Sequence, residues 1–422
     1  MMEGKYIRSV QGKKRLRYAV DLVLWSCLAA LTVVLPNAFK QVAVSVLIAT
    51  AAYYLVLRGT RLSVRLSLIW AASAFVTIFY SLIGLLNGAP DEAIRQVIVV
   101  YILSPLLWLF ALKGALEKFG LAVVVNFLVT LTVLAIFSQA FYFWAISSHR
   151  FSDILFLMAG EPNLDYSNNR VAAVMFVFGS MTFLYAGLFA SPETVRWKPL
   201  RLLLLFGSFV SVLTSGRGAL VLSIFFGVSI YLVTSVRRTG AVRKALILNA
   251  LVLLVSSLVG SYVLLAFYDI NVFGPVQDVW GKISSGGGEG RKSYLPLLIE
   301  GSADHFFLGA GHGIGVDFSV SEDFPWRYEV VGAADLFRVG ILGLLVYASP
   351  FLISLRSAFV LNSRRRLDRY EKYLLGALVA EIFIANTNPY IEAVVFQWMF
   401  VLPCVYFIDQ VNLRSFRRSV NG

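Results

Sequence analysis

The chain has 422 residues, with 37 Lys and Arg against 24 Asp and Glu, a formal net charge of +13, 58% hydrophobic residues and only 14% charged ones. Soluble domains carry about a quarter charged residues, so this composition excludes a soluble enzyme, a disordered chain and a coiled coil. Cys27 and Cys404 both lie in apolar runs, which excludes a disulfide scaffold. The apolar content is also too high for a transmembrane barrel, so the sequence predicts an all-α, polytopic bundle of membrane helices.

Apolar runs of roughly 17–25 residues predict about twelve transmembrane helices in one integral membrane domain, residues 1–422. The runs are 18–36, 42–57, 66–86, 96–112, 119–144, 170–190, 200–214, 219–234, 245–267, 334–355, 373–387 and 391–408. The first run is too long for the apolar part of a cleaved signal peptide. Residues 268–333 form the longest connection, and we expect them to carry part of the functional site, because irregular backbone in membrane proteins collects where water enters.

The basic residues predict which side of the membrane each connection faces. The segments with six Lys and Arg from Lys5 to Arg17, three from Arg414 to Arg418 and the alternate short connections between them hold 27 of the 37 basic residues. By the positive-inside rule we expect both termini in the cytoplasm and the 268–333 loop on the outer face. Anionic lipid head groups account for these charges, so we expect no nucleic-acid partner.

Two polar segments in the middle of the chain are candidate binding sites. In Ser215-Gly216-Arg217-Gly218, the guanidinium of Arg217 is a fork-shaped anion receptor, or else it snorkels from a tight hairpin. The segment 161–170 is rich in Asn and Asp, which suits helix caps and turns. The same amides could bind sugar hydroxyls while an aromatic ring stacks on a sugar. The candidate glycan-binding residues are Asn163, Tyr166 and Asn169.

The long loop holds two further candidates. Arg291 opens a stretch with helical spacing and an apolar face, which predicts a helix along the membrane surface whose basic residue faces phosphate. The run 309–315 alternates glycines around His312 but lacks the strand–helix context of a dinucleotide site. His312 is either a general base, since its ordinary pKa is near 6.5, or simply an exposed side chain in a mobile turn.

Acidic residues supply the last candidates. Asp335 and Arg338 are three residues apart at the mouth of the tenth predicted span, and form either an ion pair at a helix end or a carboxylate base held by a guanidinium. Glu381 lies within a predicted span, which is typical of a functional bundle interior, and Asp21 is expected to pair with Arg17. Three scattered histidines give no metal-ligand spacing and no nucleotide motif is present, so the sequence predicts neither a metal nor a cofactor.

The order of these motifs resembles the O-antigen polymerase and O-antigen ligase superfamily of membrane glycosyltransferases, over about residues 150–355. The segments that carry the resemblance are Pro162-Asn163 with Asn168-Asn169, Thr214-Ser215-Gly216-Arg217-Gly218-Ala219, Gly290-Arg291, His305 to Gly313, and Leu336 to Gly343. The resemblance implies transfer of a glycan from undecaprenyl diphosphate at the periplasmic face of the bacterial inner membrane, without metal or nucleotide sugar. It also implies membrane lipids and a chain-length regulator protein as partners.

The resemblance further implies roles for single residues. Arg217 is the first candidate to contact the diphosphate and Arg291 the second, with Arg338 as a third. Ligases of this family carry His-Asn just before the helix that ends the long loop, where this chain has Ala334-Asp335. We therefore expect a polymerase that joins repeat units, with an O-antigen ligase and a transporter or flippase without chemistry as alternatives. Asp335 is the favoured base and His312 the other candidate, because a fixed position matters before pKa does.

Overall fold

The computed structural model describes residues 17–34, 36, 39–147, 178–215, 218–235, 289–319, 324–387 and 389–420. This part of the chain is all-helical, without strands, as the composition predicts. Its elements are Arg17–Val34, which ends in η1 (Ala30–Val34), then α2 (Lys40–Ala52), η2 (Tyr53–Leu57), α3 (Val64–Leu86), α4 (Asp91–Ile98), η3 (Val99–Leu103), α5 (Ser104–Ser147), α6 (Phe178–Ala190), η6 (Pro192–Thr194), α7 (Lys198–Ser215), α8 (Gly218–Ser235), α11 (Glu289–Asp304), α12 (Val331–Arg365), α13 (Arg369–Ile384), η7 (Tyr390–Glu392), η8 (Val394–Phe396) and α14 (Trp398–Val420).

Long apolar helices make this a membrane protein. Among the described residues, five helices are long and apolar enough to cross a bilayer, namely Arg17–Val34, Lys40–Leu57, Val64–Leu86, Asp91–Phe137 and Val331–Arg365. Shorter apolar helices lie at Gly179–Ala190, Gly218–Thr234 and Trp398–Gln410. The count of about twelve spans stays a prediction, and its ninth member, 245–267, lies outside the described residues.

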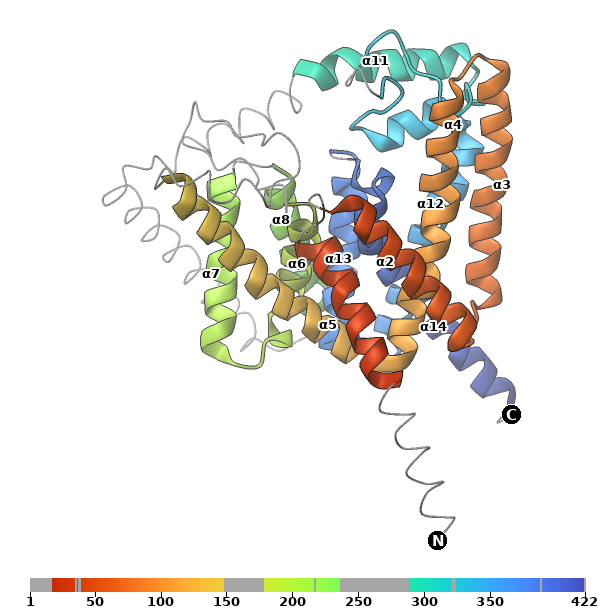
Figure 1. Cartoon of the computed structure of the whole chain (residues 1–422). Coiled ribbons are helices and arrows are strands. Elements are labelled where there is room, and N and C mark those ends of the chain that lie inside the picture. The colour runs from red at the N-terminus through yellow and green to blue at the C-terminus, as the bar shows by residue number, and fades with distance from the viewer. Residues whose placement is uncertain are drawn as a thin grey trace.

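The bundle has two distinct ends. Helix α11 lies across one end, which we call the α11 end, and the α3–α4 turn lies there too (Figure 1). The start of the Arg17–Val34 helix and the last turns of α14 lie at the opposite end, as do the α2–α3 and α6–α7 connections (Figure 1). The two ends of the described chain therefore share one side of the bundle, while the compartment that this side faces stays a prediction.

The reversal that the sequence predicts between the spans 96–112 and 119–144 occurs at one glycine. Gly120 has φ +76° and ψ 161°, a conformation that L side chains avoid, and it separates two straight halves of α5. Figure 1 shows the two halves diverging from the end opposite α11. Lys113, about two turns before Gly120, binds Asp409 of α14 at 2.5 Å and Glu117 at 3.0 Å, which ties the reversal to the C-terminal helix.

Two predicted boundaries near the C-terminus differ from the structure. Helix α13 begins at Arg369 rather than at 373, because Asp368 caps it by accepting hydrogen bonds from the amides of Tyr370 and Glu371 at 2.8 and 2.9 Å. The predicted span 391–408 begins as a helix only at Trp398. The residues before it form the short turns η7 and η8, so an irregular segment lies between α13 and α14.

The predicted pairing of Asp21 with Arg17 is wrong. Asp21 is fully buried and its carboxylate binds the guanidinium of Arg58, with the ammonium of Lys118 at 3.7 Å. Arg58 also donates to the carbonyl oxygen of Arg17 at 3.1 Å. Packing of the helices places Arg58 beside the buried carboxylate of Asp21, and this contact between helices replaces the i,i+4 pair with Arg17.

Candidate functional site

A break in α12 positions the candidate site. Gly340 has φ +64° and ψ −174°, so the helix loses the hydrogen bonds that would cross this residue. The loop after α11 replaces them, since Ile341 N donates to Phe307 O at 3.0 Å while Phe337 O and Arg338 O accept from Ala310 and Gly311 at 2.8 and 2.9 Å. The break is therefore filled by backbone from the loop rather than by water.

The same loop fits into a notch on α3. His312 N donates to Tyr80 O at 2.9 Å, the hydroxyl of Tyr80 donates to Leu308 O at 2.7 Å, and the amide of Asn87 donates to Ala310 O at 2.8 Å. Gly84 provides the space, because a Cβ there would overlap the carbonyl oxygen of His312. The alternating glycines of 309–313 thus serve close backbone approach, and three of them have positive φ.

His312 is fixed and enclosed, so the interpretation of an exposed histidine in a mobile turn is wrong. Its side chain is fully buried, and Nε2 lies 2.8 Å from the hydroxyl of Tyr347, which lies 2.8 Å from the hydroxyl of Thr77. Thr77 donates its single proton to Ser73 O at 2.8 Å. Tyr347 then donates to Thr77 and accepts from His312 Nε2–H, which leaves Nδ1 as a bare acceptor that no described residue contacts.

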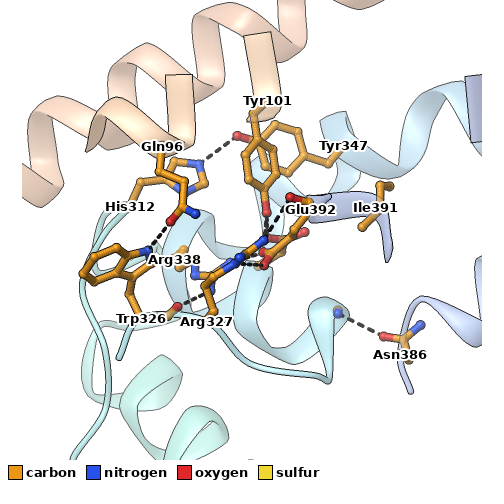
Figure 2. A network of polar contacts seen from close by, with 12 residues as sticks. Gln96, Tyr101, His312, Trp326, Arg327, Arg338, Tyr347, Asn386, Ile391 and Glu392 are labelled. Carbon is orange, nitrogen blue, oxygen red and sulfur yellow. Dashed lines mark hydrogen bonds and ion pairs between the residues drawn. The ribbon is translucent and has the colours of Figure 1, made fainter. Parts of the chain in front are cut away.

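Burial decides the charge of His312. Removal from water, together with the nearby positive charge of Arg338, lowers the pKa of His312 from 6.5 to about 3. The imidazole is therefore neutral at physiological pH. Its ring lies 5.2 Å from that of Tyr101, which in turn stacks on Tyr347 at 5.3 Å, so three rings form one packed group (Figure 2).

The predicted pair of Asp335 and Arg338 is present, but it belongs to a larger network. Arg338 Nη1 lies 3.7 Å from Asp335 and 2.6 Å from Glu392, and Nη2 donates to the carbonyl oxygen of Trp326. The hydroxyl of Tyr101 reaches both carboxylates, at 3.2 Å from Asp335 and 2.8 Å from Glu392 (Figure 2). Asp335, Arg338 and Glu392 are buried and Tyr101 is half-buried, and the closer contact of Arg338 is with Glu392.

An apolar cavity of about 280 Å³ ends at this network. Tyr101, Asp335 and Tyr347 line it near the α11 end, whereas His312 does not. Its other lining residues are mostly apolar and come from α3, η3, α5, α12, α13, α14 and the segment between α13 and α14. Those on α12 run from Val331 to Phe351. The cavity therefore follows α12 on both sides of its break at Gly340.

The structure describes some of the remaining candidate residues and not others. Arg291 lies in α11, and its side chain is outside the described set. Glu381 is fully buried, with one oxygen bound to Thr182. The residues predicted for diphosphate or glycan that lie outside the described residues are Arg217, Asn163, Tyr166 and Asn169.

Two functional candidates were missed by sequence reasoning. Tyr101 gives no signal, since aromatic residues are common in spans. Glu392 falls at the start of the predicted span 391–408, and an acid inside a predicted span was the signal that could have identified it. Within the described ranges, no three His, Cys, Asp or Glu side chains gather as a metal site requires.

Comparisons of the sequence with known proteins found no match. No family model matches the sequence, and no curated protein matches it.

Proposed function

We propose that the protein is a membrane glycosyltransferase that polymerises oligosaccharide repeat units carried on undecaprenyl diphosphate, at the periplasmic face of the bacterial inner membrane. The observation that carries this proposal is the buried carboxylate of Asp335 at the polar end of a long apolar cavity. An amphiphile whose chain lies in the cavity would bring its head group to Asp335 and Tyr101. Two of the segments that carry the resemblance, 305–313 and 336–343, also pack against each other around this point.

The proposed reaction needs a base, and the cavity favours Asp335 for this role. A hydroxyl of the acceptor glycan attacks the anomeric carbon of the donor, the bond from that carbon to the diphosphate oxygen breaks, and the electron pair leaves with the diphosphate. The proton of the hydroxyl passes to the carboxylate of Asp335. A positioned base contributes about 10²–10⁴-fold in rate. Asp335 lines the cavity and His312 does not, so His312 acts by holding Tyr347 in place.

The structure changes the role that we give Arg338. Its guanidinium is buried and bound by Glu392 and by Trp326 O, which favours positioning of the two carboxylates over an open phosphate receptor. Contact between the diphosphate and Arg217 or Arg291 stays a prediction. These arginines would stabilise charge on the leaving group, which is often the largest single contribution to catalysis.

The test is transfer by the purified protein in liposomes that contain a lipid-linked repeat unit. Asp335→Asn keeps the size of the side chain and removes the base, so we expect polymer formation to fall at least 10²-fold at unchanged protein level. Asp317→Asn is the matched control, because Asp317 is an exposed acid of the loop that precedes α12 and lies away from the cavity lining. Full activity of Asp335→Asn would remove Asp335 from the mechanism.

The same liposomes separate the competing functions. Transfer of finished polymer to lipid A-core, without chain growth, would identify a ligase, and movement of the intact lipid-linked unit across the bilayer would identify a transporter or flippase. Cys404 lines the cavity and reports its occupant in a Cys27→Ser background. We expect a lipid-linked repeat unit to slow labelling of Cys404 by an apolar maleimide, and ordinary phospholipid at the same concentration to have no effect.

A further inference from the structure

The carboxylate of Glu392 lies between two guanidinium groups. Arg338 Nη1 lies 2.6 Å from Oε1, and Arg327 Nε lies 3.6 Å from Oε2. Arg327 also donates from Nη2 to the backbone oxygen of Glu392 at 3.0 Å. Two converging arginines form the arrangement that proteins use to bind phosphate, and here an internal carboxylate occupies it (Figure 2).

An unfilled space adjoins this pair of arginines. A cavity of about 20 Å³ is lined by Arg327, Arg338, Glu392 and Gln96, among others. Arg338 Nε is buried, and no described residue accepts its hydrogen bond. A buried donor without a partner is costly, so it points to a ligand atom or a water that completes the site. The space alone holds about one water, and a phosphate group would fit only if Glu392 moves.

Glu392 lies on a short irregular segment. It ends the one-turn helix η7, between α13 and α14, where no long helix has to unwind for the side chain to leave. Neighbouring residues of this segment, Asn386 and Ile391, line the apolar cavity. Tyr101 lines both cavities and binds Glu392, so the arginine pair lies directly beside the polar end of the apolar cavity.

We propose that Arg327 and Arg338 form a phosphate site that Glu392 occupies in the resting protein, and that a phosphate group of the ligand displaces Glu392 when it binds. Glu392 is thus an internal competitor, which keeps the arginine pair closed to small anions and opens it to a ligand that also fills the apolar cavity. The identity of that ligand, a lipid-linked diphosphate, rests on the proposed function. The site itself rests on the geometry of the three side chains.

Competition sets the size of the expected effect. The apparent affinity of a ligand falls by the fraction of molecules whose site is open. If Glu392 leaves the site open in about one molecule in ten, Glu392→Gln binds anions about tenfold more tightly than the wild type. A glutamine has the same shape and can still accept from Arg338, but it carries no charge.

The experiment measures binding of inorganic diphosphate to the purified full-length protein by calorimetry and by its effect on thermal unfolding. We expect Glu392→Gln to lower the dissociation constant about tenfold, and Arg327→Gln in the same background to remove this gain. Asp317→Asn deletes an equally charged exposed acid and should leave the constant within twofold. Equal or weaker binding by Glu392→Gln, or a gain that survives Arg327→Gln, would overturn the proposal.

Two further outcomes are distinguished by the same design. If Glu392→Gln does not fold, Glu392→Asp provides the test, since its shorter arm keeps the charge, weakens the contact with Arg338, and should also tighten diphosphate binding. Unchanged binding by Glu392→Asp would then make Glu392 a structural ion-pair partner only. Because the probe is an inorganic anion, tighter binding without any glycosyl transfer would support the phosphate site and refute the proposed function.

Discussion

A methyl group added at Gly84 should dislodge the loop that carries His312. The Cβ of alanine would overlap the carbonyl oxygen of His312 and lie 3.0 and 3.1 Å from its carbonyl carbon and amide nitrogen. These are backbone atoms, so no side-chain rotation relieves the contact. Overpacking of this kind costs about 1–3 kcal/mol. A displaced loop also loses the hydrogen bonds to Tyr80 O and from Asn87, each about 1 kcal/mol net.

The overpacking and the lost hydrogen bonds are partly offset by the gain of about 1 kcal/mol that alanine brings over glycine inside a helix. We therefore expect Gly84→Ala to lose about 2–4 kcal/mol of unfolding free energy. The assay is unfolding in detergent, together with modification by diethyl pyrocarbonate mapped by mass spectrometry. His312 is buried and should react only in the variant, while the exposed His305 reacts in both proteins. Gly218→Ala is the control, since a Cβ there meets no atom within 4 Å. If Gly84→Ala had wild-type stability and His312 stayed unmodified in it, the fit of the loop into the notch on α3 would be refuted.

Two other expectations follow from buried groups. The pKa of His312 is lowered to about 3, so below pH about 6.5 the unfolded chain takes up a proton at this residue and the native state does not. The contribution of His312 to stability is therefore complete above that pH. Between pH 6.5 and 5, the unfolding free energy of the wild type should fall by about 1.4 kcal/mol per pH unit more than that of His312→Gln. Parallel profiles would contradict this assignment. Thr182 has one hydroxyl proton but contacts both Gly179 O, at 2.6 Å, and Glu381. When Thr182 donates this proton to Gly179 O, its hydroxyl oxygen is satisfied by a side chain at position 381 that donates a hydrogen bond to it, as the amide of glutamine can. Glu381→Gln should therefore unfold within about 1 kcal/mol of the wild type, whereas Glu381→Lys should fail to accumulate in the membrane, which immunoblotting of membrane fractions measures.

Sequence reasoning predicted local features and missed contacts between distant segments. The membrane class, a reversal after the span 96–112 and the Asp335–Arg338 pair depend on composition or on neighbouring residues, and all three are present. The reversal falls at Gly120, inside the predicted span 119–144. Glu392 reaches Arg338 across 54 residues, a partnership that no spacing rule predicts.

The break in α12 was equally hidden from the sequence. The run Val339-Gly340-Ile341-Leu342-Gly343 has the apolar composition of an unbroken span. Gly340 departs from helical geometry only because the 307–311 backbone supplies alternative hydrogen bonds. The alternative of an exposed His312 in a mobile turn was wrong for the same reason, since the notch on α3 receives the backbone of this glycine-rich run.

The notch on α3 also fixes when the site can form during synthesis. Tyr80 binds a carbonyl oxygen 228 residues further along the chain, so α3 enters the bilayer long before its partner leaves the ribosome. Assembly around Asp335 is thus a late, post-insertion event, and a nascent chain that stops before Leu308 holds Tyr80 and Gly84 in place without the loop that they receive.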